Sequence, residues 1–177
     1  MSGFHCVYPE GNTMKEGMIV STQTVNGTFT LQVPDTFEPV SPEELRQMSG
    51  GGDPFGWGMR DRERHVMILA LWKQYPALLA RLADLKAMAK KNQQLTARMY
   101  AGHGYRFLET LSGQAGNEKA EGYRYMYSAG DISQVGTCFL IKAGKTVYSI
   151  ICAGREENKD RDLAMIRDVL KSFQYLS

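Results

Sequence analysis

Four alternating segments, separated by short gaps, constrain the fold of this chain more than any other feature. They cover residues 105–111, 121–127, 135–141 and 146–152, and each is rich in β-branched and aromatic residues. Every gap contains glycine and is shorter than the dozen or so residues that a parallel crossover needs. The sequence therefore predicts a meander of four antiparallel strands.

The first half of the chain adds a hairpin, a capped helix and another strand. Asn26-Gly27 is typical of a tight turn, and the segment after it places three apolar residues on one face: Phe29, Leu31 and Val33. Ser41-Pro42-Glu43-Glu44 predicts a helix start, with a capping box between its first and last residues. Residues 65–72 are almost all apolar, as in a strand covered on both faces.

Two longer amphipathic segments predict helices that cover the sheet. One extends from Pro76 to about Tyr100, with an apolar stripe formed by Leu78, Leu82, Leu85, Met88 and Ala89. The other begins at Asn158 or Asp160. The resulting order, β-β-α-β-α-β-β-β-β-α, predicts an α+β fold with a central antiparallel β-sheet of about six to seven strands flanked by about three helices. Residues 17–177 are expected to form one domain, preceded by residues 1–16 as an N-terminal arm or an extra edge strand.

Two stretches of the sequence resemble the PsbP-like superfamily. Residues 29–37 (FTLQVPDTF), followed by the capped helix, resemble the F-x-L-x-x-P-x-x-aromatic opening of these domains, and residues 166–173 resemble their last helix. The order of elements between them also agrees, so the resemblance spans roughly residues 17–175. It implies an α/β/α sandwich and a function in binding proteins without catalysis, as in the PsbP subunit of photosystem II and a Ran-binding import factor. It implies no particular partner, because the matching residues are core and turn residues.

Charge, hydropathy and cysteine content restrict the classes of partner and the cellular location that can be expected. The chain has 21 basic and 19 acidic residues, and this balance gives no electrostatic reason to expect nucleic acid or anionic lipid as a partner. Its longest apolar run, residues 66–72, is too short to span a bilayer. Three cysteines form no disulfide framework, so a cytoplasmic location is expected. A chain from which an export signal had been removed would look the same.

No group of residues predicts a catalytic centre, a cofactor site or a metal site. The three histidines lie on three separate predicted elements: His5, His65 and His103. Glycines 50–52 lack both the Lys-Ser/Thr ending and the following helix of a phosphate-binding loop, which favours a flexible linker.

The cysteines of the predicted meander are expected to be buried small hydrophobic residues and not nucleophiles. With a turn at Ala143-Gly144, Cys138 would lie opposite Ser149, and Cys152 opposite Val135. The two side chains would then face opposite sides of the sheet and could not bond.

Two groups of aromatic residues are candidate partner-binding sites. Phe55 and Trp57 lie in a predicted mobile loop, residues 53–64, where they either anchor an interface or fold back as a lid on the core. A second group shares one face of a predicted strand: Tyr123, Tyr125 and Tyr127. These tyrosines either pack under a helix or form an exposed platform for a partner.

The sequence therefore predicts a non-catalytic protein-binding module, adaptor or chaperone-like, whose protein partner is unknown. An alternative is a small-ligand-binding protein or weak enzyme with a pocket between the sheet and the long helix. Its polar groups would be His103, Arg106 and Tyr125. A third hypothesis is a homodimer formed through an exposed sheet face.

Overall fold

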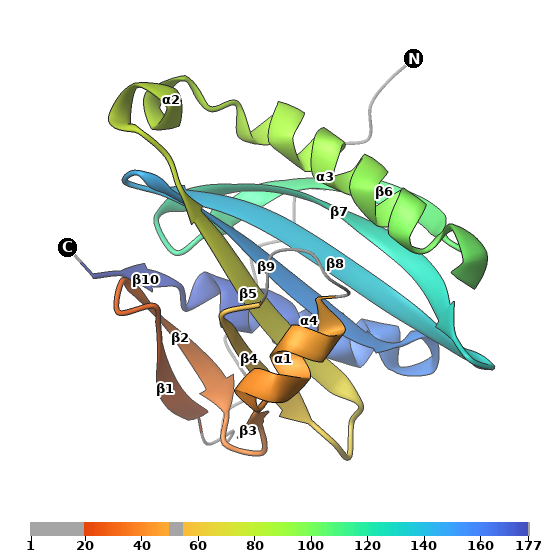
Figure 1. Ribbon diagram of the computed structural model, residues 1–177. Helices are drawn as coiled ribbons and strands as arrows, with labels where there is room; N and C mark the ends of the chain where they lie inside the picture. The colour runs from red at the N-terminus through yellow and green to blue at the C-terminus, as the bar shows by residue number, and fades with distance from the viewer. Residues whose placement is uncertain (1–19, 50–54, 177) are drawn as a thin grey trace.

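In residues 20–49 and 55–176, the part of the chain that the computed structural model describes, the backbone forms two antiparallel sheets and four α-helices (Figure 1). The larger sheet consists, in spatial order, of β3 (Glu38–Pro39), β4 (Trp57–Asp61), β5 (Val66–Gln74), β9 (Thr146–Arg155), β8 (Ile132–Ala143), β7 (Glu118–Ala129) and β6 (Arg106–Ala115). The smaller sheet consists of β1 (Val20–Val25), β2 (Phe29–Pro34) and β10 (Gln174–Tyr175). The helices are α1 (Pro42–Met48), α2 (Ala77–Leu82), α3 (Leu85–Met99) and α4 (Lys159–Lys171). The predicted α+β fold with an antiparallel sheet is confirmed.

The predicted meander is confirmed, and its strands are longer than expected. Three two-residue turns connect β6 through β9, and each begins with a glycine at positive φ: Gly116, Gly130 and Gly144. Glycine suits these positions because it has no Cβ to clash in that conformation. Tight turns leave more of the chain for pairing, so residues 112–115 and 118–119, expected in a gap, belong to β6 and β7.

The register between β8 and β9 differs from the predicted one by two positions. Cys138 lies opposite Ile151 and Cys152 opposite Thr137, because the turn is one residue later than expected, at Gly144-Lys145. A shift of two positions keeps every side chain on its own face. The prediction that the two cysteines face opposite sides is therefore confirmed, and each belongs to a different hydrophobic cluster.

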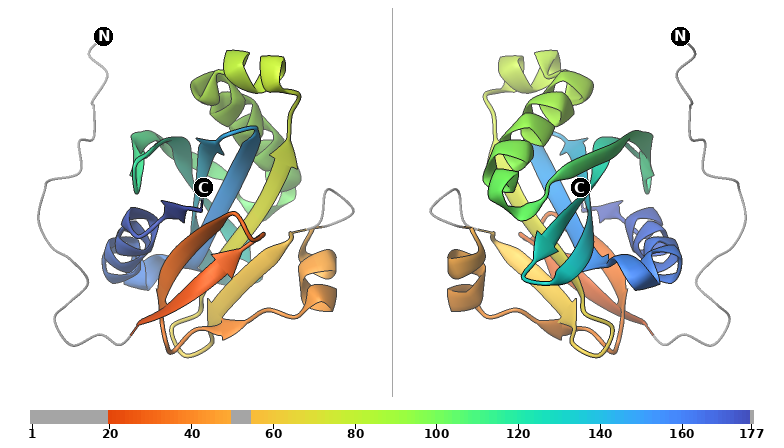
Figure 2. Two further views of the ribbon diagram at one scale, coloured as in Figure 1. Left: turned by 90° about the vertical axis from the view of Figure 1, so that its left-hand side faces the viewer. Right: turned by 90° about the vertical axis from the view of Figure 1, so that its right-hand side faces the viewer.

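The larger sheet has a covered layer on each face, as the two side views of Figure 2 show. On one face, α4 and the β1–β2 hairpin cover a cluster that includes Leu31, Ile68, Ile141, Ile150, Ile166 and Val169. On the other face, α3 covers β7 and β8, and α1 covers β4 and β5 through Leu45, which packs on Leu69 and Val40.

The β1–β2 hairpin forms its own small sheet and does not extend the main one. Its Asn26-Gly27 turn is confirmed, with both residues at positive φ. The ring of Phe29 stacks on Phe173 and meets Tyr148 edge-on, so the hairpin packs face to face against the main sheet. The end of the chain then pairs with β2 as β10.

The capping box of α1 is confirmed. The Ser41 hydroxyl accepts a hydrogen bond from the Glu44 backbone N–H, and the Glu44 carboxylate accepts one from the Ser41 backbone N–H. Arg60 of β4 donates to Glu44 at 2.6 Å and to Glu38 at 2.9 Å. The hydrogen bond from Arg60, followed by those from Ser41, lowers the pKa of Glu44 to about 2. This network attaches α1 to the edge of the sheet.

The helix predicted over residues 76–100 is in fact two helices, α2 and α3. Asp84 interrupts it, because its side chain accepts a hydrogen bond from the Lys86 backbone N–H and caps α3. The predicted apolar stripe is divided at this point. In its α3 part, Leu85 and Ala89 are buried and Met88 is half-buried, but Leu78 and Leu82 on α2 are 69% and 72% exposed.

The prediction of a mobile loop is wrong for residues 57–61, which form β4 between β3 and β5. Glycine suggested a loop, but here it allows close packing. A Cβ on Gly56 would lie 2.1 Å from the Trp72 ring, and one on Gly58 would lie 2.7 Å from Leu69. The expected linker at residues 50–52 and the expected arm at residues 1–16 lie outside the described residues.

Candidate functional site

The structure places Tyr123 and Tyr125 beneath α3, where they are 2% and 3% exposed. Of the two alternatives for this strand face, packing under a helix is the one observed. The Tyr123 hydroxyl bonds to Thr96 at 2.7 Å and donates to Asn92 Oδ1 at 3.0 Å. Burial raises the pKa of both tyrosines above the ordinary value, so their hydroxyls stay neutral.

Tyr127 continues this series at the end of β7 and is partly buried against Tyr100, with ring centroids 4.3 Å apart. The tyrosines therefore form a packed layer between β7 and α3. A partner could contact Tyr125 only if α3 moved away from the sheet, whereas part of Tyr123 also lines the cavity described below.

Phe55 and Trp57 lie on the other half of the molecule, at β4. Trp57 is half-buried against the main hydrophobic cluster, and its backbone lies opposite Ala70 of β5. Phe55 is half-buried against the small cluster beneath α1. The structure thus brings neither of them near the tyrosines, and their role in binding a partner stays a prediction.

Trp57→Ala is expected to lower the free energy of unfolding by about 2 kcal/mol, because it removes a large ring from the edge of the core. Urea unfolding of the variant and of the exposed-site control His103→Ala would measure this. A loss below about 0.5 kcal/mol would instead mark Trp57 as a surface residue and favour its use as a partner anchor.

The pocket predicted around His103, Arg106 and Tyr125 is not formed. His103 is exposed just after α3, and Arg106 is exposed with its guanidinium directed at the Met126 sulfur. Tyr125 is buried under α3. This prediction is wrong because Arg106 pairs with Met126, the residue after Tyr125, so the side chains of Arg106 and Tyr125 lie on opposite faces of the sheet.

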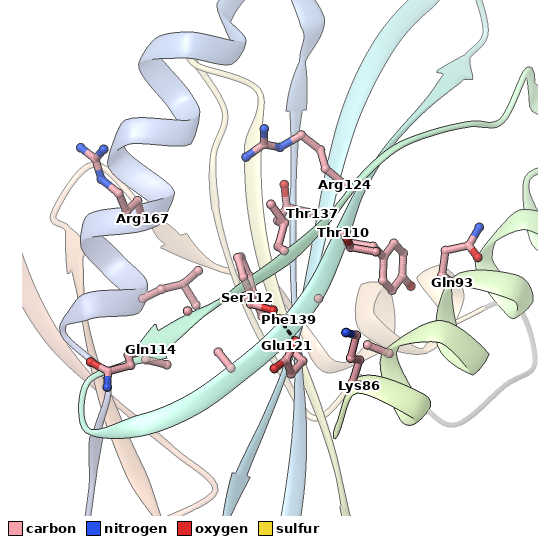
Figure 3. Close-up of a pocket in the computed structure, with 18 of the residues that line it drawn as sticks. Lys86, Gln93, Thr110, Ser112, Gln114, Glu121, Arg124, Thr137, Phe139 and Arg167 are labelled. Carbon is pink, nitrogen blue, oxygen red and sulfur yellow. Dashed lines mark hydrogen bonds between the residues drawn. The ribbon is translucent and has the colours of Figure 1, made fainter. Parts of the chain in front are cut away.

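The structure instead has a cavity of about 880 Å³ along β6, hereafter the β6 groove (Figure 3). β6 is the last strand of the larger sheet, and no other strand in the described part of the chain pairs with its outer edge. The backbone N–H and C=O groups on that edge are therefore available to another chain.

Residues on both faces of the sheet line the β6 groove, because the side chains of β6 alternate. Thr110, Ser112 and Gln114 are on the α3 face, level with Tyr123, Glu121 and Lys119 of β7. Helix α3 forms the wall of the groove on this face, where Lys86, Lys90 and Gln93 line it. On the α4 face, the walls are mainly apolar: Leu111, Ala115, Phe139, Leu163, Ile166 and Leu170. Figure 3 shows Lys86 and Gln93 on one side of the β6–β7 hairpin, and Arg167 on the other.

The groove carries an excess of positive charge. Five of its lining residues are basic, Lys86, Lys90, Arg124, Arg167 and Lys171, whereas two are acidic, Asp84 and Glu121. Both acidic groups are engaged within the fold. Asp84 caps α3, and Glu121 accepts hydrogen bonds from Ser112 at 2.5 Å and Lys119 at 2.9 Å. Burial alone would raise the pKa of Glu121, but these two bonds and the positive charges of Lys119 and Lys86 outweigh it and leave the pKa below the ordinary value.

The basic side chains of the groove are less engaged. Among the described residues, Lys86, Lys90 and Lys171 form no ion pair. Arg124 bonds to Glu109, but its Nε is buried without a hydrogen-bond partner. The Nε of Arg167 is likewise unpartnered, with the Asp168 carboxylate 3.6 Å away. Within the described chain, the groove thus offers three lysines that form no ion pair to whatever enters it.

The remaining reactive groups do not add chemistry to this site. Burial raises the pKa of the Cys138 thiol to about 12, so it stays protonated at neutral pH. Across residues 20–49 and 55–176, no three histidine, cysteine or acidic side chains are placed to hold a metal ion. None of the helices found there is long and apolar enough to cross a membrane.

The sequence contains two signs of the β6 groove that the sequence-based predictions did not use. Residues 110–115 have no charged residue and no proline, which are two of the devices that protect native edge strands from pairing. Lys86 and Lys90 are one helical turn apart and so lie on the same side of α3.

The antiparallel sheet, covered by helices on both faces, defines an α/β/α sandwich. Solved structures of PsbP-like proteins have this architecture. The solution structure of cyanobacterial PsbP (CyanoP) from Synechocystis sp. PCC 6803 is similar, with a TM-score of 0.67 over 95% of this chain and 99% of that one. LpqN of Mycobacterium tuberculosis, involved in cell envelope biogenesis, has a TM-score of 0.54 over 92% of this chain and 88% of its own.

The sequence identity is 11% in both cases, so the likeness shows the fold alone. The chain has a PsbP-like fold, as its sequence motifs suggested. No protein-family model and no curated protein sequence matches it.

Proposed function

We propose that the chain is a non-catalytic protein-binding module, adaptor or chaperone-like, that holds a segment of its partner in the β6 groove. The observation that supports this is that a single cavity is lined by both faces of the sheet beside a free strand edge. A small compact ligand would contact one face. An extended polypeptide presents side chains alternately to both faces while its backbone pairs with the edge.

A second copy of the same chain is an alternative partner, because two β6 edges could pair about a twofold axis. Light scattering at several protein concentrations separates this homodimer from a monomer that binds a different protein. A constant monomer mass favours the different protein.

The proposal is tested by placing a photoreactive amino acid at Gln114, an exposed residue of β6 that lines the groove. Irradiation in the cells that produce the protein is expected to give a covalent adduct with a partner protein, which mass spectrometry then identifies. The control carries the same group at Thr24, an exposed residue of β1, which is also an edge strand. Equal adducts from both positions, or no adduct from Gln114, would contradict a binding site at β6.

A further inference from the structure

We infer that the β6 groove binds an acidic, extended segment of a partner protein as an added strand, with carboxylates toward α3 and apolar side chains toward α4. The inference rests on the proposed protein-binding function and names the class of segment that it would take. It follows from the strand edge, the spacing of the α3 lysines and the composition of the α4 wall.

The edge of β6 can pair with a continuous strand. A bulge interrupts the pairing of β6 with β7 between Phe107 and Glu109, and from Glu109 to Ala115 the register is unbroken. Within that stretch, residues 110–115 carry neither charge nor proline. An added strand could therefore form regular backbone hydrogen bonds there without burying a charged group of β6.

The two walls require different side chains on alternate positions of the added strand. Residues that lie directly opposite each other on neighbouring strands point their side chains to the same face of the sheet. Positions level with Thr110, Ser112 and Gln114 would thus face α3, and the positions between them would face α4. A sequence that alternates two residue types is the one that satisfies both walls.

The α3 wall favours carboxylates. Lys86 and Lys90 are free of ion pairs within the described chain and lie about 6 Å apart along the helix. Successive side chains on one face of a strand are about 6.6–6.8 Å apart. Because α3 runs along the direction of β7 in Figure 1, two carboxylates spaced by two residues would match the two lysines.

The α4 wall favours apolar side chains. Leu163, Ile166 and Leu170 form one side, and Phe139 lies at the base. Gly113 leaves this side open, because a Cβ added there would meet no atom within 4 Å. Arg167 and Lys171 at the same wall would repel a basic segment.

The test uses a short synthetic peptide in which glutamate and valine alternate, blocked at both ends and labelled with fluorescein. Fluorescence anisotropy with the full chain is expected to show saturable binding. A matched peptide with lysine in place of glutamate should bind at least about tenfold more weakly. Equal binding of the two peptides would overturn the inference.

Protein variants locate the binding. Lys90→Glu should weaken binding of the glutamate peptide about tenfold, whereas its neighbour Lys91→Glu, exposed but outside the groove, should change it less than about twofold. Gly113→Leu should also weaken it about tenfold, because the side chain fills the α4 side of the groove. Equal effects of Lys90→Glu and Lys91→Glu would contradict this placement.

Strand addition itself is tested with a peptide that is N-methylated at alternate residues. This peptide keeps its charge, but the methylated edge has lost the backbone N–H groups that would pair with β6. It should not bind detectably, and binding equal to that of the unmethylated peptide would exclude strand addition. If the glutamate peptide fails to bind while the probe at Gln114 still captures a partner, the acidic-strand inference is wrong and the proposed function stands. If the glutamate peptide fails to bind and the probe at Gln114 captures no partner, the acidic-strand inference and the proposed function are both wrong.

Discussion

Replacing Phe29 with alanine is expected to lower the free energy of unfolding by about 3–5 kcal/mol, a large part of the stability of a typical domain. Its side chain is fully buried. The ring centroid lies 4.5 Å from that of Phe173 and 4.7 Å from that of Tyr148. These contacts join β2, β9 and the segment after α4, which are far apart in the sequence. Alanine would leave a cavity where the three elements meet.

Urea unfolding followed by circular dichroism measures this loss. Phe107→Ala is the matched control, because the Phe107 side chain on β6 is 43% exposed and its removal should cost less than about 1 kcal/mol. Similar losses in the two variants would show that Phe29 does not hold the hairpin to the sheet.

Gly122→Ala is expected to destabilise the chain by about 1–3 kcal/mol, or to prevent it from folding. Gly122 lies in β7, and a Cβ there would come within 2.2 Å of the Cys138 carbonyl oxygen. Backbone atoms of a central strand cannot move aside as a flexible side chain can. The strands around residue 122 would have to separate.

Gly113→Ala, on the adjacent strand β6, is the control for Gly122→Ala. Its Cβ would meet nothing within 4 Å, so replacing glycine inside a strand should raise stability by about 0.5–1 kcal/mol. The two substitutions are chemically identical but should shift the thermal midpoint in opposite directions. Shifts of the same sign would mean that the packing around Gly122 differs from that described here.

The elements that local patterns determine could be predicted from the sequence. The meander strands, the α1 capping box and α4 depend on alternation, turn glycines and helical periodicity within short windows. The predicted β8–β9 register was wrong by two positions. Because this is an even number, Cys138 and Cys152 were still assigned to the correct faces of the sheet.

The features that depend on distant contacts could not be predicted in this way. Gly56 and Gly58 suggested a loop, and only the positions of Trp72 and Leu69 show that they permit close strand packing. The break before α3 lies at Ala83 and Asp84, whose backbones are extended, and the Asp84 side chain caps α3 there. The helix pattern of residues 76–100 continues across that break.

The candidate site was missed for the same reason. Alternation assigns Tyr123 and Tyr125 to one strand face, but it does not reveal that α3 covers that face. The β6 groove exists because β6 is the outermost strand, and the spatial order of strands is a property of the whole sheet. A charge excess in the groove is also invisible in a chain whose basic and acidic residues nearly balance.

The main sheet also separates two kinds of chromophore. Both tryptophans of the chain, Trp57 and Trp72, pack against the cluster on the α4 side. The tyrosine layer of β7 lies on the α3 side. Tryptophan emission therefore monitors the α4 side of the main sheet, and tyrosine absorption monitors mainly the α3 side. An event that lifts α3 would change the ultraviolet absorption of the tyrosines while the indole fluorescence stayed constant, so one sample can show which side of the molecule opens.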